Sequence, residues 1–354
     1  MLIIDRYLMK QVARGVLIAT LVLLPLFSFL DLVDQLDNVG TGSYQTSDAF
    51  LYVILTMPRR LIQLFPFIAL LGNVTALGRL AINQELISLR SAGYSPVQIS
   101  MASMKVGLIL LLLIMVLEVF IAPTLQQRAI AYRAAAMEQS TELGKNLGIW
   151  TRDENQILRI GNLMHDTRQA NVEILGLNDN NGLREYLRAN GFEILSNEEW
   201  ILHAVTRKTF SDAGINTTTM DSMRWKPFLN SAQISTLTKP QESLSPVELF
   251  RYVNHLQTTG QEVDVYQLVL WKKLGGPLTM IGMLLLSVPF VFGSVRTGFA
   301  NRLVLAGMTG IGVYLLDQIF SNTGLILKLN PSFIALTPGI VLIWIARVWL
   351  RRIP

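Results

Sequence analysis

The chain has 354 residues, of which 51% are hydrophobic and only 16% are charged, with a formal net charge of +5. Its apolar residues come in long blocks rather than at amphipathic spacing, which argues against a soluble protein and places the chain among membrane proteins. The lack of cysteine excludes a disulfide framework and a thiolate metal site. The three histidines are isolated, so we predict no metal site.

Six apolar segments reach the length of about 20 residues that a helix needs to cross the hydrocarbon of a bilayer. The predicted spans are approximately 14–36, 61–81, 100–122, 272–295, 301–322 and 332–350. The third and fifth reach this length only if Glu118 and Asp317 lie inside or at the end of their helices. A charge at that depth is costly and needs a partner or a wet cavity, and the roles of these two carboxylates stay open.

Lysine and arginine residues in the short connections predict the topology. They precede the first span, surround the loop after the second span, follow the fourth span and end the chain; the set is Arg6, Lys10, Arg14, Arg79, Arg90, Lys105, Arg296, Arg302, Arg347, Arg351 and Arg352. All these segments fall on one side of a six-span chain. By the positive-inside rule that side is the cytosol, so both termini are predicted to be cytoplasmic.

The segment 141–243 then lies outside and has a different, polar composition. Alternating apolar and polar residues predict strands, and Asn181-Gly182 predicts a tight hairpin turn. The predicted fold class is an α-helical integral membrane protein with three plus three transmembrane helices and an inserted all-β domain. The membrane halves would occupy residues 1–140 and 244–354.

An amphipathic helix is predicted where the chain returns to the membrane, within SLSPVELFRYVNHLQTTG at 243–260. Ser245 and Glu248 have the spacing of a capping box. A single helical face would then carry Leu249, Phe250, Val253 and Leu256, with Gly260 as a stop.

The cytosolic loop NQELISLRSAGYSP at 83–96 predicts a short helix over about 83–93, which ends at Gly93. Ser95 and Gln98 have the spacing of a second capping box, at the start of the third span. Two interpretations remain open. The helix lies in the lipid headgroups, or it fits a groove on a cytosolic partner. In the second case its contact residues would be Glu85, Leu86, Leu89 and Arg90.

Four arginines are predicted on the outer side, where the positive-inside rule does not expect them: Arg59 and Arg60 before the second span, and Arg128 and Arg133 after the third. They either anchor helix ends by snorkelling or bind the phosphates of a lipid by bidentate hydrogen bonds. Asp34, which is three residues from Asp31 and from Asp37 on one helical face, is predicted to form an ion pair with a nearby arginine.

Short motifs along the whole chain resemble the LptF/LptG permease family, and its LptG members more than its LptF members. The matching segments are DRYLMKQV at 5–12, VDQL at 33–36, GTGSY at 40–44, FPFIALLG at 65–72, ELISLRSAGYS at 85–95, AP at 122–123, GIW at 148–150, YQL at 266–268 and LDQIF at 316–320. They fall in order on both sides of the predicted membrane.

This resemblance implies a fold, partners and a function. The fold would have six transmembrane helices and a periplasmic jellyroll. The partners would be an LptF-like permease, an LptB-like ATPase dimer and an LptC-like single-span protein, which together extract lipopolysaccharide from the inner membrane of a Gram-negative bacterium. The loop after the second span would be the coupling helix, with Glu85 as its acidic residue. Arg59 and Arg133 match positions where the family places lipid-phosphate contacts, whereas Ile130 departs from another such position. Spans 1 and 5 would form lateral gates with the partner permease.

The chain contains neither G-x-x-x-x-G-K-[ST] nor G-x-G-x-x-G, so we expect no enzymatic activity and no cofactor on this chain, and ATP to be used by the partner. No nucleic-acid partner is expected. An alternative is a mechanotransmission subunit, which would couple an ATPase to a periplasmic process without moving lipid. A membrane scaffold without transport is a third possibility, but it leaves the Glu85 helix unexplained.

Overall fold

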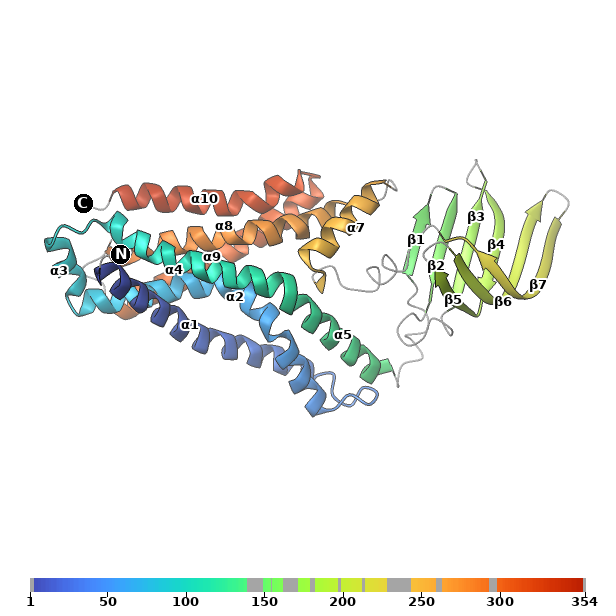
Figure 1. Ribbon diagram of the computed structural model, residues 1–354, viewed down its shortest axis with the longest axis horizontal. Coiled ribbons are helices and arrows are strands. Elements are labelled where there is room, and N and C mark those ends of the chain that lie inside the picture. Colours follow the sequence, from blue (N-terminus) through green and yellow to red (C-terminus); the bar gives the residue numbers. More distant parts are fainter. Residues whose placement is uncertain are drawn as a thin grey trace.

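A computed structural model describes residues 3–138, 149–153, 155–161, 171–178, 182–196, 199–211, 214–227, 243–258, 263–292 and 298–352. Two sets of membrane-type helices flank a β-sheet in the chain, and the sheet lies beyond one end of the helical bundle (Figure 1). In the described part of the chain, six helices are long and apolar enough to cross a membrane. The predicted fold class, with a β-sheet inserted between the third and fourth of these helices, is therefore confirmed.

The first half of the bundle begins with α1 (Ile3–Leu36) and α2 (Thr46–Ile82). The short α3 (Glu85–Ser91) follows. The third long helix is α4 (Pro96–Val116), which continues through the π-helical turn η1 (Leu117–Ile121) into α5 (Ala122–Glu138).

Two of these helices are longer than the bilayer requires. α2 has 37 residues, and the third membrane helix runs over 42 residues from Pro96 to Met137. Because a span needs about 20 residues, both helices extend well past the hydrocarbon. Arg59 and Arg60 therefore lie inside α2, which begins at Thr46, and not ahead of its first turn. Arg128 and Arg133 lie on α5, the extension of the third helix.

The second half contains α7 (Pro246–Thr258), α8 (Asp264–Phe292), α9 (Phe299–Ile326) and α10 (Pro331–Arg351). The expected capping box opens α7, because Ser245 N–H donates to Glu248 Oε2 at 2.8 Å and Glu248 N–H donates to Ser245 Oγ at 3.2 Å. Of the four residues predicted to share one helical face, Leu249, Val253 and Leu256 are buried, whereas Phe250 is 60% exposed. Gly260 lies outside the described residues.

The inserted sheet is antiparallel and consists of β1 (Ile149–Asp153), β2 (Gln156–Ile160), β3 (Val172–Leu177), β4 (Leu183–Ala189), β5 (Gly191–Ser196), β6 (Glu199–Ser211) and β7 (Gly214–Trp225). Its order is β1-β2-β3-β4-β6-β5, with β7 paired to the other edge of β6. β6 therefore pairs with β5 through its first half and with β4 through its second half. The positive φ of 49° at Ala204 falls between these two halves. Of the predicted hairpin turn, Asn181 lies outside the described residues.

Alternate strand residues give the sheet its own apolar core. Phe192 and Trp200 stack with ring centroids 4.6 Å apart, and Trp225 packs edge-on against Trp200 at 5.5 Å. Leu158, Ile174 and the other members of this cluster come only from strands of the sheet. The sheet thus contains the apolar packing that an independently folding unit needs.

Small residues bring the membrane helices together closely. A Cβ on Gly15 of α1 would lie 2.3 Å from the carbonyl oxygen of Gly72 on α2, and a Cβ on Gly282 of α8 would lie 2.7 Å from Leu342 Cβ on α10. Helices in lipid associate through such close packing, because no hydrophobic driving force acts between them in lipid. Both contacts therefore hold pairs of neighbouring spans together.

A buried polar network joins three spans in the bundle. The fully buried Asn73 of α2 donates to Ser287 Oγ of α8 at 2.6 Å and accepts from Ser103 Oγ of α4 at 3.0 Å. Each of these polar groups is satisfied by another, which is the condition for placing them in an apolar interior. The network therefore links α2, α4 and α8 in one arrangement.

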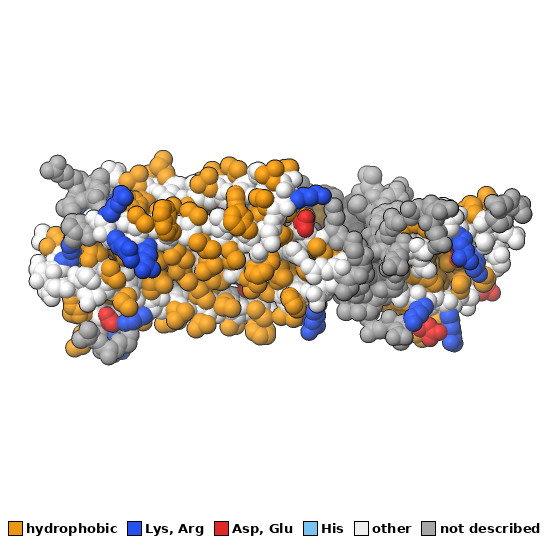
Figure 2. Space-filling view, turned by 90° about the horizontal axis from the view of Figure 1, so that it is seen from above, with side chains coloured by type: hydrophobic (Ala, Val, Ile, Leu, Met, Phe, Trp, Pro, Cys, Tyr) orange, Lys and Arg blue, Asp and Glu red, His pale blue; other side chains and the backbone are white. Residues whose placement is uncertain are grey.

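The two ends of the bundle differ. α3 and the marked ends of the chain lie at one end, and the sheet lies at the other (Figure 1). Between these ends the surface is covered with apolar side chains, and lysine and arginine side chains gather toward the α3 end (Figure 2). This is the surface expected of a protein that crosses a membrane and has one strongly basic side.

Candidate functional site

The α3 end of the molecule is anchored by one carboxylate. Tyr7 of α1 donates its hydroxyl to Glu85 Oε2 at 2.5 Å, and Asn83 Nδ2 donates to Glu85 Oε1 at 3.3 Å. α3 ends as predicted, at Gly93 with φ of 89°, where the N–H of Gly93 bonds to the carbonyl of Arg90 at 2.9 Å. Ser95 and Gln98 then form the predicted capping box at the start of α4.

The side chains of α3 divide into an inner and an outer group. Leu86 is 4% exposed and belongs to the core of the bundle, and the partly buried Leu89 packs against the same core. The guanidinium of Arg90 lies 5.8 Å from the centre of the Phe292 ring. Leu86 is therefore packed inside this chain, and the prediction that it supplies an apolar contact to a partner is corrected. Ile87, which is 59% exposed, is the large apolar side chain that α3 presents outward.

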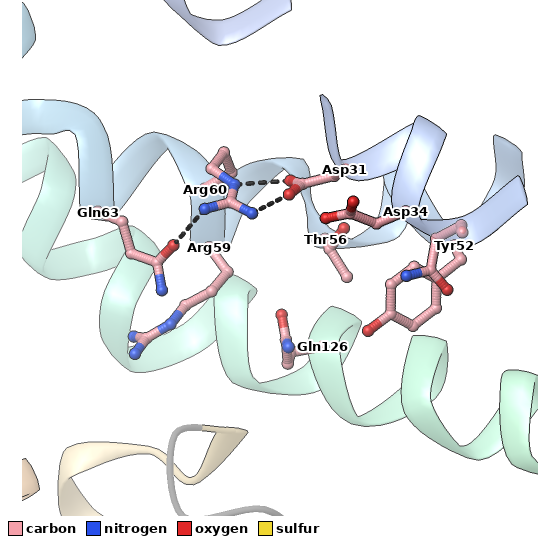
Figure 3. A pocket seen from close by; sticks show the side chains of 9 residues that line it. Asp31, Asp34, Tyr52, Thr56, Arg59, Arg60, Gln63 and Gln126 are labelled. Carbon is pink, nitrogen blue, oxygen red and sulfur yellow. Dashed lines mark hydrogen bonds and ion pairs between the residues drawn. The ribbon is translucent and has the colours of Figure 1, made fainter. Parts of the chain in front are cut away.

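A polar cavity of about 330 Å³ opens at the opposite end, between α1, α2 and α5 (Figure 3). It is lined by Asp31, Asp34, Gln35, Tyr52, Thr56, Arg59, Arg60, Gln63 and Gln126. Two of the four predicted phosphate ligands, Arg59 and Arg60, are among them. Arg128 and Arg133 are not, so the structure does not gather the four arginines at one cavity.

Arg59 is held by a buried carboxylate. Its Nη1 lies 3.0 Å from Oε1 of Glu118, and Nζ of Lys273 contacts the same oxygen from α8. The three side chains are 17%, 10% and 5% exposed, respectively. Glu118 stands in η1, the π-helical turn of the third membrane helix. The triad thus joins α2, the third helix and α8, and it supplies the partner that a charge at this depth requires.

Lys272 and Lys273 are neighbours in sequence but pair with different helices. Nζ of Lys272 lies 3.0 Å from Oδ2 of Asp317 on α9, whereas Lys273 contacts Glu118. Both of the carboxylates whose roles were open therefore have a basic partner on α8. The sequence analysis missed these lysines as partners. The signal was present, because two charges at the start of a predicted span stand beside an apolar run.

The predicted ion pair of Asp34 belongs instead to Asp31. Arg60 Nε donates to Asp31 Oδ2 at 2.6 Å, and a second guanidinium nitrogen contacts Oδ1. The bidentate geometry is the preferred one between guanidinium and carboxylate. Asp34 is exposed and forms no ion pair among the described residues; it turns its carboxylate toward the cavity (Figure 3).

The other two arginines differ from each other. Arg133 lies with its guanidinium carbon 5.5 Å from the centre of the Tyr52 ring, and its Nε is buried without a hydrogen-bond partner. Arg128 is exposed and forms no ion pair in the described part of the chain. Arg133 is therefore oriented by the protein and keeps donor capacity for a ligand, which Arg59 and Arg60 have largely committed to carboxylates.

The fold and these features define the class of protein. It is a multipass membrane protein with buried ion pairs between its spans, a small anchored helix at one end and an inserted antiparallel sheet at the other. Its sequence matches, over residues 6–352, the model of the family described as lipopolysaccharide export system permease LptF/LptG. The chain belongs to this family.

Named relatives agree with the family. The chain is 29% identical over 348 residues to the lipopolysaccharide export system permease protein LptG of Haemophilus influenzae, with 98% of this chain and 97% of that protein covered. It is 30% identical over 341 residues to the protein of the same name from Escherichia coli strain K12, with 95% and 94% covered. The resemblance to LptG members noted in the sequence is thus confirmed.

Proposed function

We propose that the chain is the LptG-type permease subunit of an ATP-driven exporter, which extracts lipopolysaccharide from the outer leaflet of the inner membrane of a Gram-negative bacterium and passes it to a periplasmic bridge. The observation that carries this proposal is the family match across nearly the whole chain, on both membrane halves and the inserted sheet. The partners would be an LptF-like permease, an LptB-like ATPase dimer and an LptC-like protein.

The position of α3 supports the coupling role. The bonds of Glu85 to Tyr7 and the burial of Leu86 connect α3 to α1 and to the bundle core, so a force applied to α3 would reach the membrane helices. The excess of lysine and arginine on the connections at this end favours a cytosolic location, where an ATPase would dock. Ile87 and the outer side of α3 would contact that ATPase.

The substrate would be held between this chain and the partner permease. α1 and α9 leave most of their apolar surface uncovered within the chain, with 17% and 11% of their most apolar stretches buried, against 61% for α2. Arg133, on the extension α5 of the third helix, would supply a phosphate contact.

The test is a reconstitution. The full chain is co-purified with its partner permease and ATPase and placed in proteoliposomes that contain lipopolysaccharide. We expect ATP-dependent removal of lipopolysaccharide from the liposome to an added periplasmic acceptor, and ATPase activity that changes when lipopolysaccharide is supplied. A catalytically inactive ATPase is the control.

The same experiment separates the alternative. A mechanotransmission subunit would show ATPase activity in the complex that is indifferent to lipopolysaccharide, and no lipid would leave the membrane. That outcome would reject the transport proposal while leaving the coupling role of α3 intact.

A further inference from the structure

The last turn of α5 is closed by a residue from another part of the chain. α5 ends at Glu138, and the carbonyl groups in the last turn of a helix have no partner within that helix. One of them, the carbonyl of Ala136, accepts two hydrogen bonds from Ser43: from its N–H at 2.9 Å and from its hydroxyl at 3.1 Å. Ser43 belongs to the connection 37–45 between α1 and α2, which lies beside the end of α5 (Figure 1). This connection therefore caps α5 from outside.

Gly42 allows the connection to approach α5 this closely. Its φ of 67° is one that residues with a side chain rarely adopt. A Cβ at this position would lie 2.6 Å from the carbonyl oxygen of Ala136 and 2.8 Å from that of Met137. Gly40 also has a positive φ, of 91°, but a Cβ there would meet no atom within 4 Å. Of these two glycines, only Gly42 is needed for the contact with α5.

A second contact, one turn earlier on α5, fixes the rotation of this helix. The hydroxyl of Tyr132 donates to Asp48 Oδ1 at 2.9 Å. Asp48 and Tyr52 are four residues apart on α2 and therefore lie on one face of it. The ring of Tyr52 packs against the guanidinium of Arg133, whose central carbon lies 5.5 Å from the ring centre. Two successive residues of α5, Tyr132 and Arg133, are thus held by two successive turns of α2.

The end of α5 has little apolar packing of its own. Ala129 is fully buried, but none of the residues 130–137 is buried. A helix end without buried apolar contacts opens easily, because short helical segments are marginally stable in water. The contacts with the connection and with α2 therefore decide how well the last two turns of α5 are held.

We propose that the connection between α1 and α2, together with Asp48, positions Arg133 by holding the end of α5. Gly42, Ser43 and Asp48 are the positioning residues. This inference rests on the proposed function, in which Arg133 contacts a phosphate of lipopolysaccharide. A guanidinium held in place loses less conformational entropy when it binds, so the affinity of that contact depends on residues that need not touch the lipid. The proposal also gives a role to the motif GTGSY at 40–44.

Hydrogen exchange tests the cap without any lipid. In the full-length complex, mass spectrometry follows the exchange of the backbone amides of residues 133–137. Gly42→Ala should raise their exchange about tenfold, because it removes both bonds to Ala136 and lets the helix end open. Gly40→Ala is the matched control, since it places a side chain at a positive φ without a collision, and its exchange should stay close to that of the wild type. No rise in Gly42→Ala, or an equal rise in both variants, overturns the cap.

Tyr132→Phe tests the second contact without straining the backbone. Asp48 is left in place, because its Oδ2 also accepts from the N–H of Gln45 at 2.7 Å at the start of α2. Since one hydrogen bond is lost, exchange of the same amides should rise about threefold. This variant also decides the matter if Gly42→Ala does not fold, and exchange equal to that of the wild type then overturns the proposal.

Lipid retention tests the link to Arg133. Purified complexes are incubated with lipopolysaccharide before or after enzymatic removal of its phosphates, and the bound lipid is quantified by mass spectrometry. Tyr132→Phe should lower retention of the phosphorylated form about threefold and leave that of the dephosphorylated form unchanged, because only the phosphate contact is disturbed. Equal losses of the two forms would indicate a general structural effect and overturn the positioning role.

A double-mutant cycle separates this proposal from the proposed function. In an Arg133→Ala background, Tyr132→Phe should cause no further loss of the phosphorylated form, since both changes act through one contact. A further loss as large as that in the wild type overturns the positioning role. If Arg133→Ala alone leaves retention unchanged, the phosphate contact is rejected and its positioning with it, whereas the exchange measurements still decide whether the connection caps α5.

Discussion

Glu118 lies between two cations that come from different halves of the chain. Arg59 belongs to the first membrane half and Lys273 to the second, and both reach the same carboxylate oxygen. Desolvation of three charges is costly, and their mutual attraction offsets this cost only while all three are present. The triad therefore fixes how the two halves fit together, and removal of its centre leaves two buried cations facing each other.

Glu118→Gln should destabilise the protein by about 3–5 kcal/mol, the usual cost of breaking a buried ion pair. The midpoint of thermal or denaturant unfolding in detergent measures this. Asp317→Asn is the control, because the Lys272–Asp317 side chains are 32% and 30% exposed and their pair should contribute much less. Adding Lys273→Met to Glu118→Gln should recover part of the loss; no recovery would show that the triad does not act as a unit.

Arg133 is the outer arginine best placed to bind a lipid phosphate, because its guanidinium is oriented on the Tyr52 ring without a carboxylate partner in the described structure. Arg133→Ala should lower the retention of lipopolysaccharide about tenfold, whereas Arg133→Lys should keep part of it as a point charge without a fork. Arg128→Ala, at an exposed neighbour on α5, is the control. Unchanged retention in Arg133→Ala would remove Arg133 from the site. Arg59→Ala is a poorer test, since it also breaks the buried triad.

At the scale of single elements, α3 is anchored to the bundle on one side and exposes its other side. Two roles of Glu85, anchoring α3 through Tyr7 and contacting the ATPase, can be separated by mutation. Glu85→Ala should weaken co-purification of the ATPase, because losing one member of a desolvated polar contact typically costs about 2–5 kcal/mol. Tyr7→Phe removes the hydrogen bond to Glu85 but keeps the carboxylate. Normal ATPase yield in Tyr7→Phe with a reduced yield in Glu85→Ala assigns Glu85 to the partner contact. Equal losses would mean that Glu85 acts by anchoring α3.

The apolar residues of α3 complete that prediction. Ile87→Ser should reduce the ATPase yield without lowering the stability of the permease, since Ile87 is exposed in the chain. Leu86→Ser should lower the stability of the permease itself, because it removes apolar packing from the bundle core. If Ile87→Ser, Glu85→Ala and Glu85→Lys all show normal ATPase yield and normal transport, the result would instead favour a helix that only lies in the headgroups. In that case Glu85→Lys should bind anionic lipid better than the wild type.

The sheet should fold by itself. A fragment of residues 141–243 should give strand-type circular dichroism and a cooperative thermal transition, because its described apolar core comes only from its own strands. Trp200→Ala within the fragment should cost about 3–5 kcal/mol, as expected for a fully buried aromatic residue. A soluble fragment with a helical or disordered spectrum would contradict the assignment of an independent β unit.

Sequence reasoning reached the spans, the strand region and the caps because these depend on local pattern. The capping boxes at Ser95 and Ser245 and the stop at Gly93 were each predicted from a few neighbouring residues. Pairings across the fold were not reachable in this way. Asp31 and Asp34 share a helical face, so periodicity alone could not tell which of them meets Arg60.

At the scale of the whole molecule, α1 and α9 are the helices least covered by the chain itself, and we expect a second permease to pack against them. The chain has no native cysteine, so single cysteines can be placed without background. Met308→Cys, at a side chain 66% exposed on α9, should crosslink to a cysteine on the partner permease. Ala306→Cys on the same helix, at a fully buried position, should not. The absence of crosslinks across a set of exposed α9 positions would place the partner elsewhere.

The third membrane helix extends far beyond the ion triad of Arg59, Glu118 and Lys273. α5 continues it for 17 residues beyond the π-helical turn, which at about 1.5 Å per residue makes an arm about 25 Å long. The arm is held at its base by Glu118 and leads toward the sheet. Beyond the triad, α5 is also tied to the start of α2, because Tyr132 donates to Asp48 Oδ1 at 2.9 Å. We therefore expect a rotation of the bundle helices around the triad to move α5 and the start of α2 together.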